Sequence, residues 1–288
     1  MKFIFVLALI VMVSCVTVCA QTDASKFPAK SSTSITQPGK HKSDVVKRNK
    51  QRNKAQMSNI RSFKVKGVSL QMVYVEGGTF RMGATSEQGS DAWGWEKPVH
   101  SVTLSGYYIG KTEVTQALWK AVMGSNPSCF KGDNLPVERV SWNDCQEFIR
   151  KLNALTGQNY RLPTEAEWEF ACRGGNNSRG YKYSGSNNLG SVAWYDGNSG
   201  NKTHPVGTKA PNELGIYDMS GNVWEWCSDW YGDYRRVAQT NPIGPYDGSY
   251  RVGRGGSWDA YARICRSSDR NGDSPALRST NFGLRLAL

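Results

Sequence analysis

The sequence has few histidines and no closely spaced pair of cysteines. Only 3 of its 288 residues are histidine, so a histidine-rich metal site is not expected. No C-x-x-C motif occurs, which disfavours a zinc ribbon or a thioredoxin-like redox site. Hydrophobic residues make up 39% of the chain and the mean hydropathy is −0.54, which suits neither a multi-pass membrane protein nor a wholly disordered chain.

The positive charge of the chain is confined to its N-terminal part. The formal net charge is +12, and residues 1–66 contain 13 Lys and Arg against 2 acidic residues. Residues 67–288 contain 23 Lys and Arg against 22 acidic residues, so the body of the protein is almost neutral. A basic surface is typical of proteins that bind nucleic acid, but no nucleic-acid partner is expected here because the basic residues lie outside the body.

The N-terminus has the pattern of an export signal. Lys2 precedes an apolar run over residues 3–18, which ends at Cys19-Ala20. This pattern predicts a signal peptide over residues 1–20 and an exported protein that is periplasmic, at the cell surface or secreted. One alternative is an uncleaved signal anchor, although the run is rather short to span a bilayer. Another is a lipoprotein, because the residues that end at Cys15 loosely resemble a lipobox; this lipid anchor would be the expected contact with a membrane.

The next segment, residues 21–66, is polar and basic. It is rich in Ser, Thr, Lys, Gln and Asn and carries two aromatic residues, Phe27 and Phe63. Such a segment buries too little apolar surface to offset its ordering entropy, so we predict a disordered basic linker. The alternative is a basic arm, centred on residues 47–54, that binds an anionic polymer or membrane. The folded domain is then expected over residues 67–288.

Five cysteines remain after the predicted signal peptide: Cys129, Cys145, Cys172, Cys227 and Cys265. Export implies an oxidising compartment in which disulfides persist. An odd number leaves at least one thiol free or paired with another molecule, and the spacing does not decide which.

The body of the chain alternates between short strand patterns and three helix patterns. Strands are expected on both sides of Gly77-Gly78 and again over residues 102–109. Helices are expected over about 113–123, 141–157 and 164–172, because two of them open with capping boxes and two of them stop at glycine. The last 110 residues are rich in Gly, Asn, Ser and Trp and predict short strands and loops. Together these patterns predict a single α+β domain with much irregular structure.

Several phrases of the sequence together resemble one family. They are MVYVEGGTFRMG (72–83), TEVTQALWKAVMG (112–124), PVERVSWNDC (136–145), RLPTEAEWEFACRGG (161–175), PVGTKAPNELGIYDMSGNVWEWCSDW (205–230), RVGRGGSW (251–258) and NFGLRLAL (281–288). In this order they are similar to the formylglycine-generating enzyme, or sulfatase-modifying factor, family over about residues 68–288. The resemblance implies the formylglycine-generating-enzyme fold, a variant of the C-type-lectin-like fold.

The resemblance does not extend to the copper site of the family's enzymes. Those enzymes use copper and dioxygen to oxidise a substrate cysteine, and they hold the metal on two cysteines shortly after a GGS motif. Here the corresponding stretch contains only Cys265, and Ala260 or Ser257 stands at the first cysteine position. We therefore expect no copper and no catalytic residues; Cys265 would be catalytic only if the chain were nevertheless an oxidase. Otherwise Cys265 is either a disulfide partner, for which Cys227 is a candidate, or a buried thiol.

The resemblance also implies a calcium loop over residues 217–226. By similarity, Asp218 and Glu225 would supply side-chain oxygens and Gly221 and Val223 would supply carbonyl oxygens. Calcium prefers six to eight hard oxygen ligands, which this loop type provides in part. The alternative is a turn in which the two acidic side chains accept hydrogen bonds from backbone amides. A second calcium loop of the family would lie near residues 192–201, but its usual asparagine is not evident here.

The last thirty residues have an unusual composition, because residues 259–288 contain no Lys, Glu, Gln, Met or Trp. Codons that are mutagenised at adenines in diversity-generating retroelements cannot encode these five residues. The stretch therefore resembles the variable segment of the proteins that such elements diversify, some of which share this fold family. The alternative is an ordinary non-catalytic paralogue with the same arginine-rich tail.

The resemblance divides the tail into a fixed framework and a mixed set that suits a binding face. The framework is Trp258, Ala262, Cys265, Arg266, Ser267, Arg270, Pro275, Arg278, Gly283, Leu284 and Arg285. The predicted ligand-binding residues are Trp258, Asp259, Tyr261, Arg263, Asp269, Asn271, Asp273, Leu277, Thr280 and Phe282.

These observations favour an exported, non-catalytic domain that binds a protein or glycan ligand at the cell envelope through its 258–282 face. One alternative is a copper-dependent oxidase that generates formylglycine on sulfatase cysteines. Another is a structural envelope lipoprotein of a secretion or gliding machinery. The identity of the ligand and the oligomeric state are not determined by the sequence.

Overall fold

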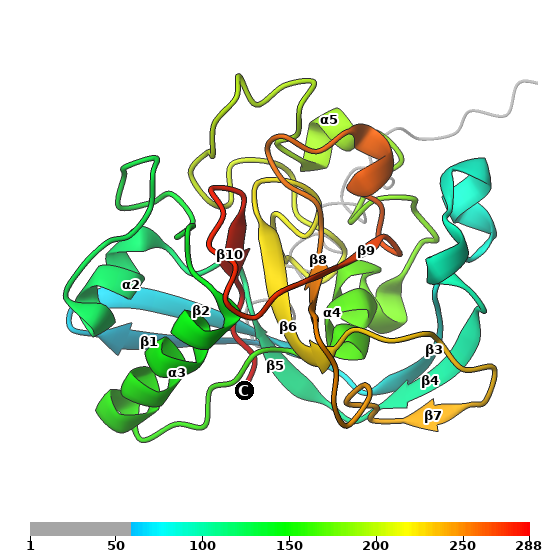
Figure 1. Cartoon of the computed structure of the whole chain (residues 1–288), viewed down its shortest axis with the longest axis horizontal. Helices are drawn as coiled ribbons and strands as arrows, with labels where there is room; N and C mark the ends of the chain where they lie inside the picture. The colour runs from blue at the N-terminus through cyan, green and yellow to red at the C-terminus, as the bar shows by residue number, and fades with distance from the viewer. Residues whose placement is uncertain (1–58) are drawn as a thin grey trace, which may run out of the picture. The chain divides into compact units, whose positions relative to one another are not determined.

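The structure, a computed structural model, describes residues 59–288. The predicted signal peptide, the lipobox at Cys15 and most of the predicted linker lie outside the described residues. Three small sheets make up the strand part of the domain (Figure 1). The first is antiparallel, with the order β1 (Ile60–Val65), β2 (Val68–Val75) and β5 (Tyr107–Gly110).

The other two sheets each contain one parallel pair of strands. The second sheet has the order β3 (Gly78–Met82), β4 (His100–Leu104) and β7 (Gln239–Thr240), with β7 parallel to β4. The third sheet has the order β10 (Phe282–Leu284), β6 (Trp224–Trp230), β8 (Arg251–Arg254) and β9 (Arg270–Asp273), with β10 parallel to β6. Strands far apart in sequence therefore meet in both sheets.

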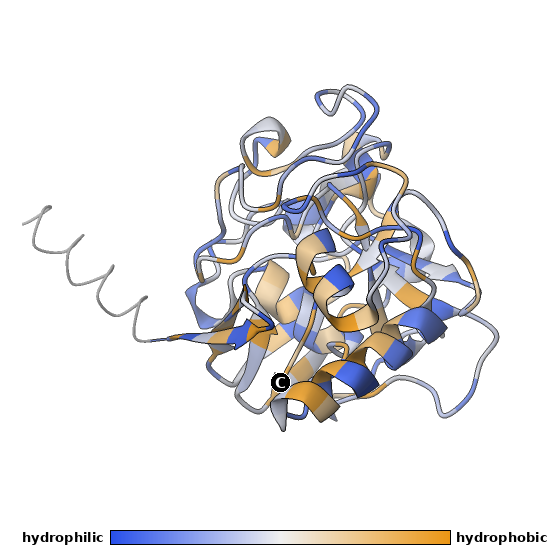
Figure 2. Ribbon diagram, turned by 90° about the vertical axis from the view of Figure 1, so that its left-hand side faces the viewer, coloured by the Kyte–Doolittle hydropathy of each residue, from blue (hydrophilic) through white to orange (hydrophobic). Residues whose placement is uncertain are grey.

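The helices are few and short. They are α2 (Gln116–Met123), α3 (Trp142–Thr156), α4 (Glu165–Cys172) and α5 (Leu189–Val192), with 3₁₀ turns η1 (Ser86–Asp91), η2 (Gly94–Glu96), η3 (Gly175–Asn177) and η4 (Ala262–Ile264). Their ribbons carry both apolar and polar residues, as expected of helices with one buried face (Figure 2). This arrangement confirms the predicted α+β class with much irregular structure.

Capping residues explain where the three longer helices begin. Ser141 and Thr164 accept hydrogen bonds from the backbone amides three residues further on, and each forms the predicted capping box. Thr115 caps α2 in the same way, so this helix begins later than the predicted residue 113. Gly124 and Gly157 end α2 and α3 in the left-handed conformation, with φ of 83° and 67°.

The predicted linker is wrong at its C-terminal end. Residues 60–65 form strand β1, which pairs with β2 along its whole length. Lys66 and Gly67 both have positive φ, 47° and 86°, which allows a tight two-residue hairpin turn. Phe63 packs edge-on against Tyr160 at 5.8 Å between ring centroids. The polar composition hid this strand because its stability comes from pairing with β2 and from a few apolar contacts, those of Ile60, Phe63 and Val65, between polar residues.

The C-terminal segment runs through the middle of the domain. Strand β10 lies beside β6 (Figure 1), and Leu288 exchanges two backbone hydrogen bonds with Tyr108 of β5. Phe282 is buried and its ring lies 4.4 Å from the ring of Trp226 and 5.9 Å from that of Trp224. The prediction that Phe282 belongs to a ligand-binding face is therefore wrong, because the parallel pairing with β6 turns its side chain into the core.

Candidate functional site

Buried arginines fix the segment that carries most of the predicted binding residues. Arg266 donates two hydrogen bonds to Glu96, at 2.8 and 2.6 Å, and both side chains are fully buried. Arg270 pairs with Glu165 at 2.6 Å and Arg285 pairs with Glu225 at 2.6 Å. The three arginines belong to the predicted fixed framework. Their burial in ion pairs explains why another residue type cannot easily replace them. Unpaired charges in these positions would be costly.

Just before Arg266 in the sequence, three predicted residues are exposed. Asp259, Tyr261 and Arg263 project from the turn around η4, and the side chain of Tyr261 is 67% exposed. The carboxylate of Asp259 is held in place, because it accepts hydrogen bonds from Ser257 Oγ at 2.6 Å and from Asn281 Nδ2 at 3.1 Å. The backbone here is thus rigidly supported while its side chains face solvent.

Five further predicted residues are half-buried: Trp258, Asn271, Asp273, Leu277 and Thr280. Trp258 donates a hydrogen bond from Nε1 to the carbonyl of Thr280 at 3.1 Å. Asp273 accepts a hydrogen bond from Asn271 within strand β9 at 2.8 Å. These residues border the exposed turn but are partly used in holding the domain together.

Asp269 does not lie on a surface, so its prediction as a ligand-binding residue is wrong. It is buried, and its carboxylate lies 3.4 Å from a guanidinium nitrogen of Arg266. Burial, together with the nearby charge of Glu96, raises the pKa of Asp269 to about 7. The alternation of polar residues in the tail could not show this, because the chain turns inward after η4.

Two tryptophans that the sequence analysis did not select extend this surface. Trp93 and Trp95 stack at 4.8 Å between ring centroids with an interplanar angle of 16°, and Trp95 is 45% exposed. The guanidinium of Arg263 lies 3.8 Å from the centroid of the Trp93 ring. We refer to Trp93, Trp95, Asp259, Tyr261 and Arg263 as the tryptophan–arginine face. The pattern Trp-Gly-Trp before an acidic residue was the signal that could have pointed to it.

The two parts of this face are joined beneath the surface by Glu96. The backbone amide of Trp93 donates to Glu96 at 2.8 Å, and the same carboxylate pairs with Arg266. Arg266 Nε also donates to the carbonyl of Arg263 at 2.6 Å. One buried ion pair thus fixes η2 and η4 relative to each other.

Cys265 is a buried thiol and forms no disulfide, so the suggested pairing with Cys227 is wrong. It packs in a small cluster with Tyr183, Leu189, Val192, Ala193 and Ala260, whereas the other buried cysteines lie in different clusters. Burial raises the pKa of the Cys265 thiol, which opposes formation of the thiolate that copper binding requires. In residues 59–288, no group of three or more His, Cys, Asp and Glu side chains is placed to hold a metal ion.

In the predicted calcium loop, Glu225 is already paired. Its carboxylate accepts hydrogen bonds from Arg285 and, at 2.6 Å, from Trp168 Nε1. Asp218 Oδ2 accepts from the backbone amide of Gly207 at 2.6 Å, and its buried Oδ1 lacks a hydrogen-bond partner. Calcium binding through Asp218, Glu225, Gly221 and Val223 stays a prediction. Of the two acidic side chains, only Asp218 has a carboxylate oxygen without a hydrogen-bond partner.

Glu113 lies close to Asp218 and gives the loop a second explanation. Both carboxyl groups are buried, and both oxygens of Glu113 lack a hydrogen-bond partner. Burial raises the pKa of Asp218 to about 6 and, together with the charge of Asp218, raises the pKa of Glu113 well above its usual range. Two buried carboxyl groups close together repel each other when both are ionised, so this pair is more stable when it shares one proton.

None of the helices in residues 59–288 is long and apolar enough to cross a membrane.

The comparisons with known proteins agree with the fold. The sulfatase-modifying factor enzyme 1-like domain matches residues 56–288. The chaperone protein LppX of Paenibacillus barcinonensis is 37% identical over 263 residues, which covers 72% of this chain and 87% of the relative. The formylglycine-generating enzyme of Streptomyces coelicolor is 32% identical over 285 residues, which covers 75% of this chain and 88% of the enzyme.

Solved structures show the same relationship. Treponema denticola variable protein 1 superposes with a TM-score of 0.72 at 35% identity, over 79% of this chain and 98% of that chain. PvdO from Pseudomonas aeruginosa superposes with a TM-score of 0.67 at 27% identity, over 79% and 97% of the two chains. The predicted resemblances to formylglycine-generating enzymes and to variable proteins are both confirmed. The chain belongs to the sulfatase-modifying factor, or formylglycine-generating enzyme, family.

Proposed function

We propose that this chain is a non-catalytic member of its family that binds a protein or glycan ligand at the cell envelope. The observation that carries the proposal is the tryptophan–arginine face, in which exposed side chains stand on a rigid, buried framework. Trp, Tyr and Arg are the residues that contribute most to binding energy in protein interfaces. Aromatic rings beside charges of both signs also suit sugar rings and their hydroxyl groups.

The oxidase alternative lacks its copper ligands. A Cu(I) site needs two soft sulfur ligands close together, and Cys265 is buried in a cluster that contains no other cysteine of the described chain. The stacked rings and the fixed turn around η4 instead favour recognition, because a preorganised surface loses little entropy when it binds.

Diversification by a retroelement is part of this proposal. Asp259, Tyr261 and Arg263 face solvent, whereas Arg266 and Arg285 are fully buried. Exposed positions tolerate substitution while buried ion pairs do not, so a mutagenised tail of this kind would change the ligand and keep the fold. The 35% identity to Treponema denticola variable protein 1 supports this idea. The signal-peptide pattern supports an exported location.

The test is a binding survey with a matched control. The purified protein and its Asp259→Ala/Tyr261→Ala/Arg263→Ala variant are applied to a glycan array and to separated cell-envelope proteins. We expect a ligand whose affinity falls at least about tenfold in the triple variant. The control is Leu155→Ala, which removes an exposed apolar side chain at the end of α3 and leaves binding unchanged. Equal binding by the triple variant would place the ligand site elsewhere.

A second candidate function rests on the loop between β6 and β8. Four exposed apolar side chains lie on it: Val237, Ile243, Tyr246 and Tyr250. Exposed apolar side chains that form a contiguous patch are typical of sites that bind other proteins, and four on one connecting segment favour such a patch here. A relative named a chaperone is 37% identical to this chain, which favours assistance to the folding of a partner. Suppression of insulin aggregation that is lost in Ile243→Ser/Tyr246→Ser would support it, and no suppression would dismiss it.

A further inference from the structure

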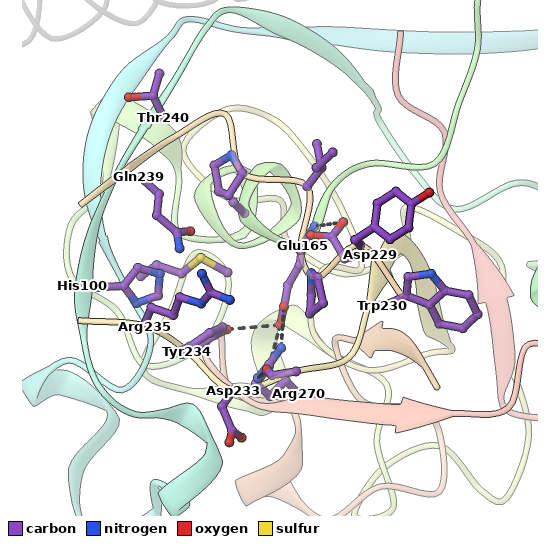
Figure 3. A pocket seen from close by; sticks show the side chains of 18 residues that line it. His100, Glu165, Asp229, Trp230, Asp233, Tyr234, Arg235, Gln239, Thr240 and Arg270 are labelled. Carbon is purple, nitrogen blue, oxygen red and sulfur yellow. Dashed lines mark hydrogen bonds and ion pairs between the residues drawn. The ribbon is translucent and has the colours of Figure 1, made fainter. Parts of the chain in front are cut away.

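The loop between β6 and β8 also forms one wall of a pocket. The pocket has a volume of about 790 Å³ and lies between this loop and the N-terminal end of α4 (Figure 3). This volume is in the range of small-molecule sites. None of the residues of the tryptophan–arginine face lines it. The pocket is therefore a separate candidate site.

Backbone contacts hold the pocket open in a defined shape. Strand β7 pairs with β4, and the backbone amide of Asn241 donates to the carbonyl of Thr103. The side chain of Asn241 exchanges hydrogen bonds with Ser105. At Gly244 a Cβ atom would lie 2.9 Å from Asp229 Cβ, so this glycine permits the close approach of the loop to β6. A pocket that is formed before the ligand arrives loses less free energy on binding.

Most charges that line the pocket are compensated. Glu165 accepts two hydrogen bonds from Arg270, at 2.7 and 2.6 Å, and one from Tyr234 at 3.1 Å (Figure 3). Asp233 and Arg235, of opposite charge, are exposed at the rim, where water screens them.

Asp229 is the exception. Its side chain is buried, with the residue 4% exposed, and it has no ion pair within 4 Å in the described part of the chain. Its Oδ2 accepts hydrogen bonds from the backbone amide of Glu165 at 3.0 Å and from Ser228 Oγ at 2.9 Å. Burial and the charge of Glu165 raise the pKa of Asp229 to about 7. The ionised form of a carboxyl group that is buried without an ion pair is stabilised when a cation binds beside it in the pocket.

The two arginines that interact with Asp229 from a distance are engaged elsewhere. Arg161 pairs with Glu167 at 2.6 Å. The guanidinium of Arg251 lies 3.4 Å from the centroid of the Trp230 ring and donates to the carbonyl of Ser228 at 2.6 Å. Neither is free to pair with Asp229, so no side chain of the described residues balances the charge of its ionised form.

We propose that this pocket binds a ligand through a primary ammonium group, with the Asp229 carboxylate as its counter-charge. Tyr246 lines the same pocket and offers an aromatic ring, which attracts an ammonium group through cation–π interaction. The ammonium group could come from a lysine side chain of a peptide or from an amino sugar, and both present the same chemistry to Asp229. This site is independent of the tryptophan–arginine face, so the failure of either proposal leaves the other standing.

The test uses two amine probes and their acetylated forms on the purified full chain. The peptide probe is acetyl-Gly-Lys-Gly-amide against its Nζ-acetyl-lysine form, and the sugar probe is glucosamine against N-acetylglucosamine. Calorimetry and tryptophan fluorescence measure binding. We expect at least one amine probe to bind and to lose at least about tenfold in affinity on acetylation, because acetylation removes the charge. The probe that binds identifies the source of the ammonium group.

Two variants tie the binding to Asp229. Asp229→Asn removes the charge but keeps an oxygen that can accept from the amide of Glu165, so the start of α4 is preserved. It should weaken the amine probe at least about tenfold, whereas Asp233→Asn at the exposed rim should leave affinity within about twofold. Equal binding of the acetylated probes, full binding by Asp229→Asn, or no binding of either amine at about 10 mM would overturn the proposal. If Asp229→Asn does not fold, the acetylated probes on the unaltered protein still decide.

Discussion

Replacing Arg266 by methionine tests the ion pair that holds the tryptophan–arginine face together. Methionine keeps most of the length and volume of the side chain but removes every donor. The variant therefore lacks the two hydrogen bonds that Arg266 donates to Glu96 and the one that it donates to the carbonyl of Arg263. Glu96 is left fully buried with a negative charge and no cation. Breaking a buried pair in this way costs about 3–5 kcal/mol, a large part of the stability of a domain.

The exposed pair of Arg278 and Asp144 provides the control. It has similar geometry, with two hydrogen bonds at 2.6 and 2.7 Å, but the arginine side chain is 60% exposed. Arg278→Met should therefore cost about 0–1 kcal/mol. Chemical denaturation at pH 7, read by tryptophan fluorescence, compares the two variants. Both variants lose two hydrogen bonds to a carboxylate, and Arg266→Met also loses the one to the carbonyl of Arg263. Most of the difference between them should therefore come from the burial of the ion pair.

The pH dependence gives the prediction a second test. Burial acts to raise the pKa of Glu96, but hydrogen bonds from Arg266 and Ser268 outweigh it and hold this pKa below its usual value. The pair therefore stabilises the protein above about pH 4.5 and this contribution is lost as the pH falls through the pKa of Glu96. In Arg266→Met the carboxyl can be protonated and become neutral, so the cost of the substitution should shrink between pH 7 and pH 4. A cost below about 1 kcal/mol at pH 7, or one that does not change with pH, would refute this reasoning.

Three further predictions concern the loop around Asp218. Burial raises the pKa of Asp218 to about 6, so its ionisation lowers stability as the pH rises from about 4 to above 6. The stability of Asp218→Asn relative to the unaltered protein should therefore increase by about 1.4 kcal/mol between pH 5 and pH 8 in denaturant unfolding. If the predicted calcium site forms, calcium should raise the melting temperature, EDTA should reverse the rise, and Asp218→Asn should abolish both effects; no response to either would contradict the calcium prediction. Gly221 has φ of 81°, and a Cβ atom there would lie 2.2 Å from the carbonyl oxygen of Trp194. Gly221→Ala should therefore lower stability by about 2 kcal/mol or more in the same assay, and an unchanged midpoint would contradict the close approach.

The sequence was informative where local chemistry decides the structure. The capping residues Ser141 and Thr164 and the glycines after the helices act within one turn, so they could be found without knowledge of the fold. The family motifs likewise identified the fold family from the sequence alone. The framework arginines Arg266 and Arg285 were identified by resemblance, and the structure gives the reason, because both neutralise buried carboxylates.

The sequence was uninformative where distant segments decide. Phe282 and Asp269 share their residue types with good binding residues, and only the pairing of β10 with β6 and the inward turn after η4 bury them. Trp93 and Trp95 lie far in sequence from Arg263, and their association depends on the ion pair between Glu96 and Arg266. No periodicity within one segment can reveal such contacts.

Copper titration tests the central claim, that this family member binds rather than oxidises. Cu(I) is titrated into the purified protein and into Cys265→Ser against a chromogenic chelator, and a cysteine-containing sulfatase peptide is then added with dioxygen. We predict that both proteins give the same curve and that no aldehyde forms on the peptide, because a single buried thiol cannot make a two-sulfur site. Tight Cu(I) binding that requires Cys265, followed by aldehyde on the peptide, would contradict the account.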